Sequence, residues 1–155
     1  MTICKQEATP HDLNESFHEP EPLHEITKAT PEMLISSLKS QQEFRVRLYS
    51  LLKAAYKQYM TSGNHGNYEA TTLILTNAFN NVNHQCKIIN GVFEGIGLKE
   101  CELMGERLNS LEEQKFKLEI EMLMGKQVDL DAVSQIKKEI MEIMEFFQSE
   151  LVDLS

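Results

Sequence analysis

The stretch EFRVRLYSLLKAAYKQYMTSG, residues 43–63, decides the fold of this chain. Its apolar residues recur at alternating steps of three and four, which places them on one face of an α-helix. That face consists of Arg45, Leu48, Leu52, Ala55 and Tyr59. A guanidinium on a face that the helix must bury needs a partner inside the fold or a route to solvent. The stretch therefore predicts a buried helix with a polar interruption.

The same spacing continues on both sides of this stretch. Upstream, Thr30 and Pro31 form a good helix start, because the hydroxyl can cap free amides and proline tolerates the first helical position. Downstream, the glycines and asparagines of residues 61–67 predict a chain reversal. Further on, Gly95 and Gly97 interrupt the pattern again. We expect four helices, at about residues 31–60, 68–94, 98–124 and 130–153.

Long helices with this spacing and short connections predict an all-α fold, namely an antiparallel four-helix bundle. The alternative is a helical-hairpin coiled coil that a partner completes. The segment from Gly95 to Gly97 distinguishes the two, because a tight turn there gives the bundle and a kink gives the hairpin. Residues 1–29 hold three of the four prolines and show no sustained apolar period. We expect them to form a disordered acidic tail before a helical domain at residues 30–153.

Composition excludes several classes of function. The net charge of −9 argues against strong direct binding of nucleic acid, because such binding requires neutralised phosphates. No apolar run approaches the roughly 18 residues of a membrane span, and the beginning of the chain is too polar for a signal peptide. Three cysteines without a CxxC pair suit a reducing compartment. We therefore expect a nuclear or cytoplasmic protein that is neither secreted nor bound to membranes.

Catalytic motifs are missing from the sequence, which has no GxSxG, no P-loop and no HExxH. We therefore expect no enzyme activity, no catalytic residues, no cofactor and no metal site. The helical surfaces would instead bind protein partners. A second copy of the chain is one such partner, and it would give a homo-oligomer.

Arg45 is the first candidate for a register-setting residue. In an up-down-up-down bundle the first and last helices are antiparallel, and counting at equal rise places Arg45 level with about residue 139. Glu139 is then the first candidate partner and Glu142 the second, with Lys115 near the same level. A polar layer of this kind would prevent the apolar stripes from sliding by a heptad. The alternative is that Arg45 faces outward and binds a carboxylate of a partner protein.

Basic side chains also lie off the apolar stripe of the first helix. These basic residues are Lys39, Arg47, Lys53 and Lys57. They predict either a surface for an acidic partner or an ordinary solvated face. No aromatic residues interleave with them to stack on bases, which favours the solvated face.

Residues 32–150 resemble the B-type proteins of the "required for excision" family, which are small eukaryotic helical proteins linked to DNA repair. The segments that carry the resemblance are SQQEFRVRLYSLLKAAYKQYMTSG at 40–63, TNAFNNVN at 76–83 and LNSLEEQKFKLEIE at 108–121. Within the first segment, Tyr49, Tyr56 and Tyr59 belong to the pattern and are candidate interaction residues. Phe116 stands where the family pattern has leucine.

The resemblance implies a non-enzymatic helical adaptor or scaffold that acts in DNA repair through protein–protein contacts. It transfers no catalytic residue to this chain. The alternative function is that of a structural coiled-coil component of a cytoskeletal or other large assembly.

Overall fold

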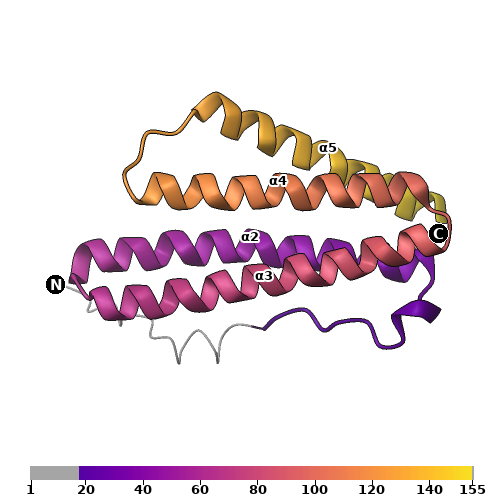
Figure 1. The fold of residues 1–155 in the computed structure, drawn as a ribbon, viewed down its shortest axis with the longest axis horizontal. Helices are drawn as coiled ribbons and strands as arrows, with labels where there is room; N and C mark the ends of the chain where they lie inside the picture. Colours follow the sequence, from indigo (N-terminus) through magenta and orange to yellow (C-terminus); the bar gives the residue numbers. More distant parts are fainter. Residues whose placement is uncertain (1–17, 155) are drawn as a thin grey trace.

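Four long α-helices dominate the computed structural model, which describes residues 18–154. They are α2 (Pro31–Ser62), α3 (His65–Gly95), α4 (Lys99–Leu123) and α5 (Leu130–Leu154), preceded by the short 3₁₀ helix η1 (Ile26–Lys28). Each helix runs antiparallel to the one before it (Figure 1). The prediction of an all-α antiparallel four-helix fold is confirmed. The described helices contain no stretch of the length and apolarity that crossing a membrane requires.

The first helix begins as predicted. Thr30 Oγ1 accepts a hydrogen bond from the Met33 amide at 3.2 Å, and Pro31 occupies the first turn. At the other end of α2, Gly63 adopts a left-handed conformation with φ of 70°. Asn64 then caps the next helix by accepting from the Asn67 amide at 3.0 Å. The reversal therefore needs only two residues, and α3 begins three residues before the predicted position.

The segment between α3 and α4 is a turn and not a kink. Gly97 has φ of 78°, a conformation that side-chain-bearing residues rarely adopt. The Leu98 amide bonds back to the Phe93 carbonyl at 2.9 Å, which closes the end of α3. Because the chain reverses here, the chain itself supplies four helices. This turn excludes the long hairpin that a partner would complete.

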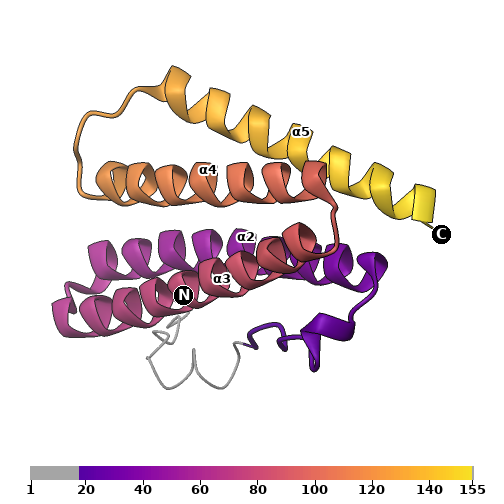
Figure 2. The same cartoon turned by 45° about the vertical axis from the view of Figure 1, so that its right-hand side comes forward.

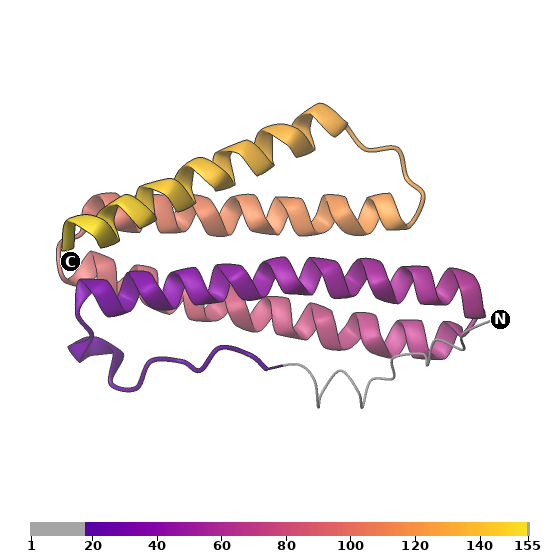
Figure 3. The same cartoon turned by 180° about the vertical axis from the view of Figure 1, so that it is seen from behind.

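The helices form two layers, with α2 beside α3 and α4 beside α5 (Figures 1 and 2). Helix α5 is inclined to the others. Its C-terminal part closes one end of the bundle, where the ring of the fully buried Phe147 stacks on that of Phe93 at 6.3 Å. Its first turns stand away from α2, as the view from behind shows (Figure 3). Helix α5 therefore approaches α2 only towards its C-terminal end, although its buried residues extend from Val133 to Phe147.

Residues 18–29 run along the outer side of the α2–α3 layer, opposite α4 (Figures 1 and 3). Leu23, Ile26 and Ala29 are partly buried against the core. The structure places these residues against the helical domain, in part of the segment for which the sequence predicts a disordered tail. Two or three apolar side chains are enough to dock a short segment but too few to produce a visible period in the sequence. The prediction for residues 1–17 lies outside the described residues.

Candidate functional site

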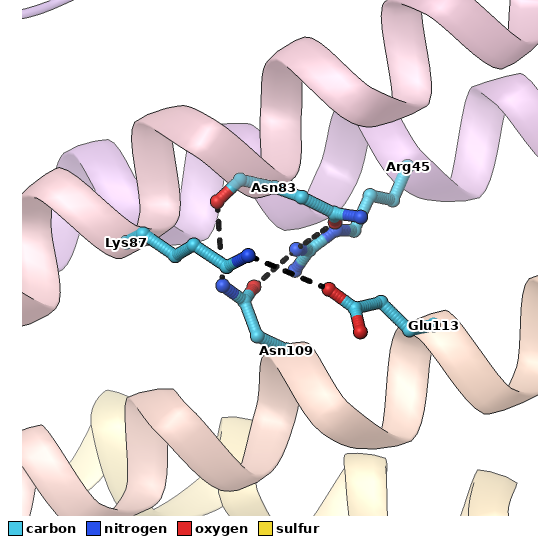
Figure 4. Close-up of polar contacts among 5 residues, drawn as sticks. All are labelled: Arg45, Asn83, Lys87, Asn109 and Glu113. Carbon is cyan, nitrogen blue, oxygen red and sulfur yellow. Dashed lines mark hydrogen bonds and ion pairs between the residues drawn. The ribbon is translucent and has the colours of Figure 1, made fainter.

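A buried polar layer crosses the middle of the bundle and is centred on Arg45, whose side chain is fully buried. Its Nη1 donates to Gln42 Oε1 at 3.2 Å, and its Nη2 donates to Asn83 Oδ1 at 2.6 Å and to Asn109 Oδ1. The Asn109 amide in turn donates to the Asn83 backbone carbonyl at 3.3 Å (Figure 4). One guanidinium therefore joins α2, α3 and α4.

Glu112 supplies a negative charge to the same layer and is also fully buried. Its carboxylate accepts from Gln42 Nε2 at 2.8 Å and from the Tyr49 hydroxyl at 2.8 Å. Gln42 accepts from Arg45 and donates to Glu112, so its amide connects the cation to the anion. The layer holds two opposite charges whose terminal groups are hydrogen-bonded, while Arg45 Nε is buried without an acceptor.

The expected internal partner of Arg45 exists, but it comes from other helices than predicted. Glu139 on α5 accepts from Arg107 Nη2 at 2.8 Å and from its Nε at 3.1 Å, and it does not bond to Arg45. Glu142 lines a surface pocket together with Arg107. The prediction of Glu139, with Glu142 second, is wrong because counting at equal rise assumes parallel axes, whereas α5 is inclined. Because Arg45 is fully buried, the prediction that it faces outward is also wrong.

Lys115 lies beside the polar layer, close to the predicted level. Its Nζ is 4.1 Å from the centroid of the Tyr49 ring, which is a cation–π contact. Partial burial lowers the pKa of Lys115, while the carboxylates of Glu112 and Glu119 act in the opposite direction. Lys115 is therefore a cation at the edge of the core and not an ordinary solvated lysine.

The remaining sequence-predicted residues lie apart from this layer. Tyr59 stacks on Tyr68 at a centroid distance of 4.8 Å, and Tyr56 meets the same ring edge-on at 6.2 Å. These half-buried rings join the ends of α2 and α3 beside their turn. Arg47 is exposed, with its Cζ 5.3 Å from the centroid of the Phe44 ring. Neither Arg47 nor the cluster of Tyr56, Tyr59 and Tyr68 contributes to the polar layer.

Four members of the layer were missed by the sequence analysis, namely Gln42, Asn83, Asn109 and Glu112. A signal was present, because Asn83, Asn109 and Glu112 each follow directly after an apolar stripe residue. A polar residue next to the stripe points into the core only if a third helix covers that side. The sequence pattern of one helix does not show where its neighbours lie.

Replacing Tyr49 with phenylalanine should change how stability depends on pH. Burial raises the pKa of Tyr49, and the charge of Glu112 raises it further, although Arg45 opposes the shift. The unfolded chain ionises this phenol near pH 10 while the folded protein keeps it neutral, so stability falls as pH rises above about 10. The slope from this one group is about 1.4 kcal/mol per pH unit. Urea unfolding between pH 8 and 11.5 measures it.

Tyr49→Phe should lose this alkaline slope and should cost about 1–3 kcal/mol at neutral pH, because Glu112 loses a donor. The comparison with the parent protein isolates Tyr49, since Lys115 contributes a slope of opposite sign to both proteins. Parallel stability curves for the two proteins above pH 10 would contradict the buried, neutral phenol.

The polar layer has a structural role. Its charges are shielded from water and connected through Gln42, so they determine how three helices align. Within residues 18–154 no three histidine, cysteine or acidic side chains gather closely enough to hold a metal ion. The thiols of Cys86 and Cys101 are buried and free. Burial raises the pKa of Cys101 to about 11, with Glu150 and Glu100 adding to the shift, so the thiol stays protonated at neutral pH.

Comparison with known proteins identifies the family. The model of the DNA repair REX1-B family matches residues 33–126, which is more than half of the chain. The matched residues contain the whole polar layer and end before α5. No curated protein and no solved structure matches this chain. The resemblance seen in the sequence is thereby confirmed, and the chain belongs to the DNA repair REX1-B family.

Proposed function

We propose that this protein is a non-enzymatic adaptor that acts in the nucleus during DNA repair through protein–protein contacts. The family supplies the link to repair. The observation that supports an adaptor is the burial of Arg45 and Glu112 in a layer that aligns α2, α3 and α4. Such a layer makes a rigid scaffold, and a rigid scaffold presents its outer surfaces in a constant arrangement.

The charge of the chain supports protein partners over nucleic acid. With a net charge of −9, the surface repels phosphate backbones. Part of the basic face of α2 is also used within the fold. Lys53 lies 3.9 Å from Glu119, and Lys39 donates to Gln148 on α5. The protein should therefore reach damaged DNA through other proteins.

Localised irradiation of cells that express a tagged full-length chain tests this function. The adaptor should accumulate at damaged chromatin, and cells without it should remove lesions more slowly until the parent chain is restored. Steady residence on a filament or organelle, with normal lesion removal, would refute the proposal and favour the structural coiled-coil function.

A further inference from the structure

Helices α2 and α5 separate from each other along their length. Near the beginning of α2, the Lys39 ammonium donates to Gln148 on α5. Residues seven positions apart lie on nearly the same face of an α-helix, so the next facing pair along these two antiparallel helices is Val46 and Met141. Their side chains are 53% and 63% exposed. The two helices therefore touch at the first pair and leave the second pair open to solvent, in agreement with the view from behind (Figure 3).

This open side continues towards the loop between α4 and α5. On α2, steps of seven residues lead from Val46 to the exposed Lys53 and then to Met60, which is 64% exposed. On α5, the same face holds the exposed Lys137 and Leu130. Apolar and basic side chains thus alternate on both helices. We call this surface the α2–α5 face, and it consists of Val46, Lys53, Met60, Leu130, Lys137 and Met141.

The lysines of the α2–α5 face retain unused hydrogen-bond donors. Lys53 Nζ lies 3.9 Å from the carboxylate of Glu119, which is too long for a hydrogen bond. Lys137 forms no ion pair or hydrogen bond through its ammonium among residues 18–154. Burial lowers the pKa of Lys115 on α4, which Glu112 and Glu119 oppose, and the charges of Lys137 and Lys53 lower it further. Three ammonium groups from three helices therefore repel one another here, and a bound anionic group would relieve the repulsion.

The two helical segments that border this face contain no acidic residue. Residues 44–62 of α2 have none, and residues 132–138 of α5 have none, so all 24 acidic residues of the chain lie elsewhere. An acidic partner would be attracted to this face, whereas the rest of a chain with a net charge of −9 would repel it. Charge complementarity thus favours a negatively charged partner at the α2–α5 face.

The alternation of apolar and basic positions also limits the form of the partner. Free phosphate would satisfy the lysines but would leave the exposed valine and methionine side chains in water. A helix with leucines on one side and glutamates beside them would contact both kinds of position, because helices that pack along each other meet at steps of three and four residues. Methionine side chains adapt to the shape of such a partner.

We propose that the α2–α5 face binds an acidic amphipathic helix of a protein partner, which lies between α2 and the first turns of α5. This inference deepens the proposed adaptor function and rests on it, because it states the chemistry of the partner. The helix would place apolar side chains on Val46 and Met141 and carboxylates on Lys53 and Lys137. The distance from Val46 to Met60 along α2 is about 21 Å, so a partner helix of about four turns covers the face.

A titration of the full-length, ¹⁵N-labelled protein with a blocked peptide tests this site. The peptide contains three repeats of Leu-Glu-Glu-Leu-Leu-Glu-Glu, which place the leucines on one side of a helix. One analogue carries glutamine in place of each glutamate, and a second carries alanine in place of each leucine. The parent peptide should shift the amides of residues 46–60 and 130–141 but not those of residues 77–95. Each analogue should bind at least about tenfold more weakly, because it offers only one of the two kinds of contact.

Lys53→Gln with Lys137→Gln tests the basic half of the face. This variant should weaken peptide binding by about tenfold, because two charged donors are lost. Lys28→Gln with Lys87→Gln is the matched control, since both residues are exposed lysines outside the face. The control changes the net charge equally and should leave the affinity within about twofold of the parent protein.

Val46→Thr with Met141→Gln tests the apolar half without changing any charge. Both side chains are more than half exposed, so the fold should stay intact while peptide binding weakens by at least about fivefold. Leu73→Gln on α3 is the matched control, because Leu73 is 62% exposed and lies outside the face. The circular dichroism spectrum of each variant verifies that the helices are intact.

The site would be overturned by the absence of these amide shifts, by equal binding of either analogue, or by equal weakening from the lysine control pair. Binding to phosphatidylserine vesicles that the peptide does not displace would show a membrane surface instead. A dimer that dissociates in the Lys53→Gln, Lys137→Gln variant, measured by sedimentation velocity, would show that a second copy covers the face.

The titration is independent of the cell experiment. The α2–α5 face can fail to bind the peptide while recruitment to damaged chromatin succeeds, which would leave the repair function standing. If recruitment fails while the peptide binds as expected, the face stands and the repair function falls.

Discussion

Arg45→Met should lower the free energy of unfolding by about 3–5 kcal/mol, the range for breaking a buried ionic network from one side. The change leaves Asn83 Oδ1 and Asn109 Oδ1 without their charged donor. It also removes the positive charge that balances the buried Glu112. Chemical denaturation at neutral pH measures the loss. Because the methionine side chain has a volume similar to that of arginine, a cavity would contribute little to the loss of stability.

Arg47→Met is the matched control, because Arg47 lies two residues away on the exposed side of the same helix. Its effect should stay within about 0.5 kcal/mol. Arg45→Lys should recover only part of the loss, because a single ammonium cannot reproduce a fork that reaches α2, α3 and α4. A stability of Arg45→Met equal to that of Arg47→Met would show that the layer contributes nothing.

A double-mutant cycle with Glu112→Gln tests whether the two buried charges act together. Each single change leaves the other charge uncompensated, whereas the double change removes both. The double variant should therefore lose less stability than the sum of the single losses, by about 1–2 kcal/mol. Strict additivity would mean that Gln42, which lies between the two charges, screens them from each other.

Phe147→Ala should have an effect of similar size, about 3–5 kcal/mol. Phe147 is fully buried and packs on both Phe93 and Phe146. These contacts close the end of the bundle where α5 is anchored. Because the first turns of α5 stand away from α2, losing this anchor should loosen the whole helix (Figure 3).

Hydrogen exchange distinguishes a loosened α5 from a general loss of stability. In Phe147→Ala the amides of α5 should exchange faster than those of α2 and α3, which keep the polar layer. Met141→Ala is the control on α5, since Met141 is 63% exposed and its truncation should cost less than about 0.5 kcal/mol. Uniformly faster exchange in every helix would show that α5 unfolds only together with the others.

The helices and their order are properties of the sequence itself. The spacing of apolar residues by three and four determines which face each helix buries, and this information is local to each helix. Thr30, Pro31 and Gly63 define the ends of α2 through backbone preferences that need no tertiary contact. The family resemblance is likewise readable from short ordered segments such as residues 76–83 and 108–121. Even the expectation that Arg45 needs either a partner or a route to solvent follows from its place in the stripe.

Only the tertiary structure decided which partner Arg45 has. The inclination of α5 takes Glu139 to Arg107, while α3 and α4 bring Asn83 and Asn109 to the guanidinium. A polar residue beside an apolar stripe is solvated or buried according to where the neighbouring helix lies, and that depends on crossing angles set by packing of the whole core. The docking of Leu23 and Ile26 arises in the same way, because it needs a surface that only the assembled helices create.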